Sequence, residues 1–268
     1  MRMCFVLLPD SKPLAAAPFE KALKEFPELG PVKWEKAEKE GASSFKVGGI
    51  EVITALMPVP VPDGEADGAS ERSLSGLGGS WTLPEHRAHL VVVEPGATHA
   101  KVEELTTFTR VVAAVVRATN ALGVYWGEGG ATHHPEFVVN IAHSELPLPI
   151  WVGISVGEGN GVTELLSIGM KQLGLPDLLL EAPEADAQVL EFFYDLLAYV
   201  TRRGKKLPNG DTVGRTEKER IKVRYVKSPI DPTAEVWTVR IPAAKKAKKK
   251  PAAAKKKKTA PSKKKKKK

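Results

Sequence analysis

The clearest structural pattern in the chain is 102-VEELTTFTRVVAAVVRATNALGVYW-126. Within it, one set of residues recurs at spacings of three and four, which places the set on one face of an α-helix. Gly123 ends this helix, and residues 124–126 read as a short strand after it. Because the apolar run 89–93 precedes the helix, we predict a strand–helix–strand crossover. The periodic set comprises Val102, Leu105, Thr109, Val112, Val116 and Thr119.

Working outward, two glycine-containing turns predict β-hairpins. Gly48-Gly49 separates two extended runs, and Asn160-Gly161 separates the apolar run 150–156 from 162–168. We expect residues 150–156 to form a central strand, because the run is apolar throughout. The remaining elements are helices near 18–26, 135–144 and 186–203, and strands near 3–8, 178–180, 221–226 and 236–241.

The mixture of hairpins, helices and a crossover predicts an α+β fold with mixed sheets packed against helices. A duplicated two-layer sandwich is an open alternative. The proline-rich run 58–62 must leave its sheet, because proline lacks a backbone donor, and residues 63–80 predict a loop. We expect one globular domain over residues 1–242, followed by a separate segment at 243–268.

Charge is divided unevenly along the chain. The 268 residues include 40 basic and 32 acidic ones, for a formal net charge of +8. Residues 243–268 hold 15 of the lysines and no acid, so residues 1–242 hold 25 basic and 32 acidic residues, a net charge of −7. The basic isoelectric point therefore belongs to the C-terminal segment and does not by itself indicate a basic binding face on the folded part.

Residues 243–268, the lysine-rich segment, consist mainly of lysine, alanine and proline, with no apolar face to bury. We expect disorder there, because charge repulsion and ordering entropy meet no compensating burial. The composition is similar to that of linker-histone tails and suits neutralisation of phosphates, without aromatic residues for base stacking. The alternatives are a solubilising or merely tolerated extension, or binding to anionic lipid, polyphosphate or the acidic part of the same chain. The candidate polyanion-binding residues are Lys245, Lys246, Lys248, Lys249, Lys250, Lys255, Lys256, Lys257, Lys258, Lys263, Lys264, Lys265, Lys266, Lys267 and Lys268.

The single cysteine, Cys4, excludes an intramolecular disulfide and lies in a short apolar run that predicts a small buried side chain. That run is too short for a secretory signal, and no stretch approaches the roughly 18 uninterrupted apolar residues of a membrane-spanning helix. We therefore expect a cytoplasmic protein without a transmembrane segment.

All six histidines lie between His86 and His143. No carboxylate or cysteine stands at a recognised zinc spacing from them, so we predict no metal and no cofactor. The loop after the crossover strand is the best place for a small cleft. Packing of its tryptophan in the core and exposure of its polar residues is the simpler alternative. The cleft would be lined by His89, Trp126, Glu128 and His134.

Two motifs in 153-GISVGEGNG-161 suggest chemistry. The glycine run lacks the lysine and hydroxyl of a nucleotide-binding loop, and Glu158 would repel a phosphate. Ser155 stands between two glycines, as in a nucleophile elbow, but an elbow requires a helix directly after the serine. Since a hairpin is predicted here, we assign no catalytic residue to this segment.

Five segments together resemble a known family. They are 52-VITALMPVPVP-62, 86-HRAHLVVV-93, 122-LGVYW-126, 167-SIGM-170 with 173-LGLP-176, and 209-NGDTVG-214. Their arrangement resembles the bacterial domain-of-unknown-function family 4261, over most of residues 1–242 and without the lysine-rich segment. The family has no established activity, so the resemblance implies a bacterial, cytoplasmic protein and assigns no site.

Three functional hypotheses follow. The preferred one is a non-enzymatic binding or regulatory module whose lysine-rich segment contacts nucleic acid or another polyanion. The second is a module that binds a protein partner, such as an immunity or adaptor factor, in which the segment only aids solubility. The third is an enzyme of unknown reaction that uses polar residues of the loops at 126–134 and 63–80.

Overall fold

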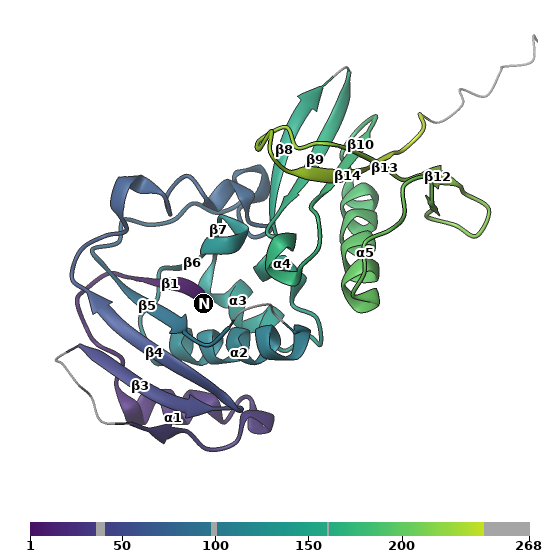
Figure 1. Ribbon diagram of the computed structural model, residues 1–268. Helices are drawn as coiled ribbons and strands as arrows, with labels where there is room; N and C mark the ends of the chain where they lie inside the picture. The colour runs from purple at the N-terminus through teal and green to yellow at the C-terminus, as the bar shows by residue number, and fades with distance from the viewer. Residues whose placement is uncertain (36–40, 98–100, 160, 244–268) are drawn as a thin grey trace, which may run out of the picture.

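The computed structural model describes residues 1–35, 41–97, 101–159 and 161–243 (Figure 1). These residues form two large β-sheets, a short two-stranded ribbon and five α-helices, which confirms the predicted α+β class. The first sheet comes from the N-terminal half of the chain and the second from the C-terminal half (Figure 1).

Sheet A has seven strands in the order β2-β3-β4-β5-β1-β6-β7, and all neighbours are antiparallel. The N-terminal strand β1 lies inside the sheet, between β5 and β6. The strands are β1 (Arg2–Leu8), β2 (Lys33–Trp34), β3 (Ala42–Val47), β4 (Ile50–Met57), β5 (Ala88–Glu94), β6 (Gly123–Trp126) and β7 (Ala131–His133).

The predicted crossover is confirmed. Helix α2 (Val102–Ala118) joins β5 to β6, and both strands run antiparallel to β1 between them, so they are parallel to each other. Helices α1 (Ala16–Leu23) and α3 (Pro135–Ala142) lie beside α2 on the same face of sheet A (Figure 1). The buried side of α2 includes Leu105, Thr109, Val112 and Val116, as the spacing predicts.

The hairpin of β3 and β4 is also confirmed, with Val47 opposite Ile50. Gly48 and Gly49 have φ angles of 58° and 82°, which glycine adopts without steric cost.

The other face of sheet A is partly covered by residues 58–83. Val61 and Ala66 of this segment pack against Leu7 of β1 and Tyr125 of β6. The segment contains three short 3-10 turns, at Pro62–Gly64, Ser70–Arg72 and Leu77–Gly79, in the region where composition predicts a loop.

Sheet B has five strands in the order β13-β14-β10-β9-β8, and helix α5 (Ala187–Arg203) covers one face (Figure 1). We call the opposite face the outer face. Strand β10 runs parallel to β14, and the other neighbours are antiparallel. The strands are β8 (Gly153–Gly159), β9 (Val162–Ile168), β10 (Leu178–Ala182), β13 (Arg224–Lys227) and β14 (Glu235–Arg240), and the ribbon contains β11 (Thr212–Val213) and β12 (Ile221–Lys222).

The prediction of a central strand at 150–156 is wrong. Leu148–Trp151 form helix α4, with a proline in the first turn, and β8 begins only at Gly153. Strand β8 is at the edge of sheet B, because among the described residues only β9 pairs with it. A short apolar run does not distinguish a buried helical turn from a buried strand. Ile150 of α4 is fully buried, as a residue of a central strand would be. The β8–β9 hairpin itself is confirmed.

The two sheets differ in topology. Strand β1 separates the two parallel strands of sheet A, whereas β10 and β14, joined through α5, are direct neighbours. Each sheet carries helices on one face, as a pair of two-layer sandwiches would, but the strand orders do not repeat.

One apolar core runs through both sheets, and Cys4 lies within it as predicted, where burial raises the pKa of its thiol. Gln172 ties the sheets together. Its Oε1 accepts a hydrogen bond from Trp126 Nε1 (3.2 Å), and its Nε2 donates to the carbonyl oxygen of Trp151 (2.9 Å). The backbones approach so closely that a Cβ on Gly153 would lie 2.3 Å from the carbonyl oxygen of Gly129. Among the described residues, no helix is long and apolar enough to cross a bilayer.

Candidate functional sites

The structure does not bring the four residues of the predicted cleft together. His89 and Trp126 project from opposite faces of sheet A, because their register partners on β1, Leu7 and Cys4, have opposite orientations. The His89 ring lies within hydrogen-bond distance of the carbonyl oxygen of Val59 (2.9 Å), and burial lowers the pKa of this histidine. The Trp126 ring packs in the core.

Glu128 and His134 lie at opposite ends of the β6–β7 hairpin. Glu128 is exposed in the turn between the strands. His134 caps helix α3, because its Nδ1 accepts a hydrogen bond from the backbone N–H of Glu136 (3.2 Å). The four residues of the predicted cleft therefore have separate roles. The tryptophan packs in the core, and the polar residues are exposed or bonded to the backbone.

A buried serine–histidine pair lies nearby and was missed from the sequence. Ser73 Oγ is 2.7 Å from His133 Nδ1, and His133 Nε2 is 2.9 Å from the carbonyl oxygen of Ile150. Because that carbonyl only accepts, Nε2 donates to it, and Nδ1 accepts from the serine hydroxyl. Burial lowers the pKa of His133 to about 4. Both side chains are fully buried, so this arrangement fastens residues 70–75 to β7 and α4 and does not face a substrate.

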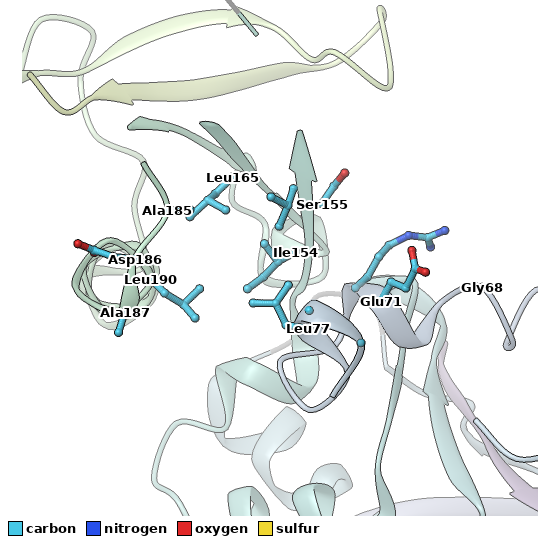
Figure 2. Close-up of a pocket in the computed structure, with 14 residues that line it drawn as sticks. Gly68, Glu71, Leu77, Ile154, Ser155, Leu165, Ala185, Asp186, Ala187 and Leu190 are labelled. Atoms are coloured by element: carbon cyan, nitrogen blue, oxygen red, sulfur yellow. The ribbon is translucent and has the colours of Figure 1, made fainter. Parts of the chain in front are cut away.

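An apolar groove of about 730 Å³ opens between β8, the first turn of α5 and the loop at 68–79 (Figure 2). Leu77, Ile154, Leu165 and Leu190 extend towards the space between these elements (Figure 2). Polar groups at the rim are Glu71, Arg72, Ser155 and Asp186.

The polar rim of the apolar groove is partly engaged within the protein. Asp186 Oδ1 accepts a hydrogen bond from the backbone N–H of Val189 (2.9 Å), and Arg72 Nη1 donates to the carbonyl oxygen of Gly130 (2.7 Å). As predicted, Ser155 is followed by continuing strand and not by a helix. The groove therefore offers apolar contact beside an edge strand, which suits a small apolar ligand or an extended peptide.

A second groove of about 670 Å³ lies on the outer face of sheet B, and we call it the cation-lined groove. Three of its cations come from β12, β13 and β14, and the fourth is the residue before β12. Two carboxylates, Glu181 and Glu219, also line the groove. Arg220 is held in place, because its Nη1 donates to the carbonyl oxygens of Glu217 (2.6 Å) and Glu219 (2.8 Å). The four cations are Arg220, Lys222, Arg224 and Arg240.

The cation-lined groove is a local basic surface on a folded part whose net charge is negative. Net charge averages over the whole surface, whereas the groove collects cations that alternate with apolar residues in 220-RIKVRYVK-227. That period of two places Lys222 and Arg224 outward and buries Ile221 and Val223. The alternation was visible in the sequence, but its significance depended on Arg240, which joins from β14.

The lysines proposed to bind a polyanion, Lys245 to Lys268, lie outside the described residues. The described chain leaves β14 through Ile241 and Pro242, and Pro242 itself lines the cation-lined groove. The lysine-rich segment therefore begins at the groove.

These features define an α+β protein whose second sheet bears a cation-lined outer face. A family model described as Domain of unknown function (DUF4261) matches residues 166–240, which confirms the predicted resemblance for that segment. The match is narrower than expected, because the three quoted segments before residue 166 lie outside it. It spans β9 to β14, and thus every residue of the cation-lined groove except Pro242. No curated protein and no solved structure matches the chain.

Part of the family segment has a structural role. Residues 169–177 connect β9 to β10, and Asp177 closes the connection by accepting hydrogen bonds from Ser167 Oγ (2.8 Å) and the backbone N–H of Met170 (3.0 Å). Burial raises the pKa of the Asp177 carboxyl. Ser167 Oγ in turn accepts from the backbone N–H of Leu178 (2.8 Å). These contacts give the segments 167-SIGM-170 and 173-LGLP-176 a structural role, because they hold the loop between β9 and β10 in place.

Proposed function

We propose that the chain is a non-enzymatic binding module that attaches to a polyanion, nucleic acid above all, through its lysine-rich segment. The observation that carries the proposal is the charge separation: 15 lysines and no acid in residues 243–268, against a net charge of −7 in residues 1–242. A cytoplasmic location is part of this proposal, since nucleic acid is accessible there.

The physical basis is counterion release. Each lysine that neutralises a phosphate frees condensed cations into solution, and this favourable entropy is independent of base sequence. No aromatic residue occurs between 243 and 268, so affinity there does not depend on base stacking. Residues 1–242 carry a net charge of −7, so attraction to a polyanion is concentrated in the lysine-rich segment.

The geometry supports the same proposal. The lysine-rich segment starts directly after Pro242, which lines the cation-lined groove together with its four cations. A polyanion held by the segment therefore meets further positive charge where the segment joins the fold.

The test compares the full chain with a neutral-segment variant, in which all 15 lysines of residues 243–268 are glutamine. Fluorescence anisotropy of labelled DNA and RNA duplexes is measured over a salt series. We expect tight binding by the natural chain, with a fall in the logarithm of the binding constant of about 0.9 per phosphate contacted for each tenfold rise in salt concentration. The variant should show a much smaller salt dependence. Equal binding by both chains, or none by either at low salt, would contradict the proposal.

The apolar groove favours a second candidate function, binding of a protein partner, in which the lysine-rich segment only aids solubility. Val156 of the edge strand is 49% exposed beside the groove, and the edge backbone of β8 has no partner strand among the described residues. Leu77→Asp, with Lys33→Asp as a surface control, separates this from the first function. If Leu77→Asp abolishes a reconstituted complex with a partner protein and Lys33→Asp does not, the partner-binding function is supported. If Leu77→Asp leaves every reconstituted complex intact, the partner-binding function is rejected.

A further inference from the structure

Thr238 of β14 lies in the cation-lined groove between two arginines. Arg224 of β13 is its register partner, so the two side chains are neighbours on the same face. Arg240 lies two residues farther along β14 and faces the same side, because side chains alternate along a strand. The residues on either side of Thr238, Trp237 and Val239, belong to the core, which places Thr238 on the outer face.

Within the part of the chain that the structure describes, the cations of the groove have no ion-pair partner. No carboxylate of the described residues lies within 4.0 Å of the charged groups of Arg220, Lys222, Arg224 or Arg240. Glu219 is already engaged, since Arg215 Nε donates to its Oε2 at 2.9 Å and the backbone N–H of Arg215 donates at 2.8 Å. Glu181 is the remaining carboxylate, so positive charge exceeds negative charge in the groove.

The hydroxyl of Thr238 supplies an independent observation. Its side chain lines the groove and is 9% exposed, yet its Oγ1 has no hydrogen-bond partner among the described residues. Buried hydroxyls are almost always paired, because an unpaired one loses its hydration without replacement. The other described atoms of this kind, in Arg2, Thr106 and Tyr194, line neither the apolar nor the cation-lined groove.

We propose that the cation-lined groove is a phosphate-binding site whose ligand is the phosphodiester backbone of nucleic acid. A phosphate oxygen accepts hydrogen bonds from the forked guanidinium groups of Arg224 and Arg240, and from the Thr238 hydroxyl once rotation of that side chain turns the buried oxygen towards the groove. Lys222 adds a further positive charge. The inference rests on the proposed function and deepens it, because a folded phosphate site fixes where the polyanion runs as it enters the lysine-rich segment.

The first experiment removes the lysines and retains the groove. Two proteins are titrated with labelled DNA duplex at low salt: the neutral-segment variant, and the same variant carrying Arg224→Gln and Arg240→Gln in addition. We expect the neutral-segment variant to retain weak, salt-dependent binding, and the double substitution to weaken it about tenfold. The slope of the logarithm of the binding constant against the logarithm of the salt concentration should become smaller by about 2. The matched control, Arg87→Gln/Arg202→Gln, removes two exposed arginines away from the groove and leaves the binding unchanged.

The second experiment uses the natural full chain with inorganic phosphate as the probe. Thermal unfolding is compared in phosphate and in chloride at equal ionic strength, for the natural chain and Thr238→Val. We expect phosphate to stabilise the natural chain, and Thr238→Val to weaken phosphate binding about tenfold without lowering the unfolding temperature in chloride. The valine retains the shape of the threonine, so a purely structural role would not produce this separation.

The outcomes distinguish the two proposals. If the natural chain binds the duplex but the neutral-segment variant does not, and phosphate fails to stabilise, the groove site is rejected while the lysine-rich segment keeps its role. If neither chain binds duplex although phosphate stabilises through Thr238, the nucleic-acid ligand is rejected. Binding of the neutral-segment variant to phosphatidylglycerol vesicles in place of duplex also rejects it.

Discussion

The two grooves of sheet B lie on opposite faces of the same sheet and have opposite chemistry. Leu165 of β9 lines the apolar groove beside α5, whereas its neighbour Glu164 is on the outer face. Each groove lies towards a different edge of the sheet: the apolar one at β8, and the cation-lined one near β13. The outer face also buries Leu166, Leu179 and Val236 beside its charged residues. The difference teaches that alternation along a strand specifies the two faces independently: the face under α5 is used for packing, and the outer face combines a small apolar cluster with charge.

The largest expected effect tests the packing face. Leu165 is 2% exposed at the floor of the apolar groove, and Leu165→Ala leaves a cavity there, so it should lower the free energy of unfolding by about 4 kcal/mol. The adjacent Glu164→Ala, on the other face, should change it by less than about 0.5 kcal/mol. Urea denaturation measures both, and similar losses in the two variants would contradict the comparison.

Acid should loosen the wall of the apolar groove. The native pKa of His133, about 4, is lower than its ordinary value of 6.5, so the unfolded state binds the proton more readily. The contribution of this histidine is therefore complete above pH 6.5 and is lost as the pH falls towards 4, with a total of about 3 kcal/mol. Because the Ser73–His133 pair anchors residues 70–75, the 77–79 part of the wall should become more mobile.

The measurement is the unfolding free energy against pH for the natural chain and His133→Gln. Carboxylates titrate in both proteins, so the difference between the two curves isolates the histidine. Parallel curves from pH 7 to pH 4 would exclude this role for His133.

Two glycines of β8 should respond oppositely to alanine. A Cβ on Gly153 meets the backbone oxygen of Gly129 at 2.3 Å, so Gly153→Ala should lower the free energy of unfolding by about 2 kcal/mol. Nothing lies within 4 Å of a Cβ on Gly157, farther along the open edge, so Gly157→Ala should raise it by about 0.5 kcal/mol. Thermal unfolding of the pair checks the contrast, and destabilisation of equal size would show that the edge is also packed.

The smallest effect on folding belongs to the cation-lined face. Thr238→Val removes a buried hydroxyl that has no hydrogen-bond partner among the described residues, so the free energy of unfolding should stay the same or rise by up to about 1 kcal/mol. Chemical denaturation in chloride buffer measures this change. A loss above about 1 kcal/mol would indicate that the hydroxyl already has a bound partner.

Local patterns accounted for much of the fold. The stripe of α2, the Gly48-Gly49 turn and the β8–β9 hairpin involve contacts between near neighbours, which periodicity and turn chemistry specify. The run 150–156 was misassigned because apolar character alone does not separate helix α4 from strand β8. The candidate site was harder to predict from the sequence, since its residues come from separate strands.

The sequence by itself determined the α+β class, the hairpins, the crossover and the charge separation between residues 1–242 and the lysine-rich segment, because each depends on local composition or spacing. Only the tertiary structure decided that β8 is an edge strand, that His133 meets Ser73, and that Arg240 joins Arg224 around Thr238. Those relationships depend on strand order and register. Strand order and register are set by burial of the whole core, which no short stretch of sequence encodes.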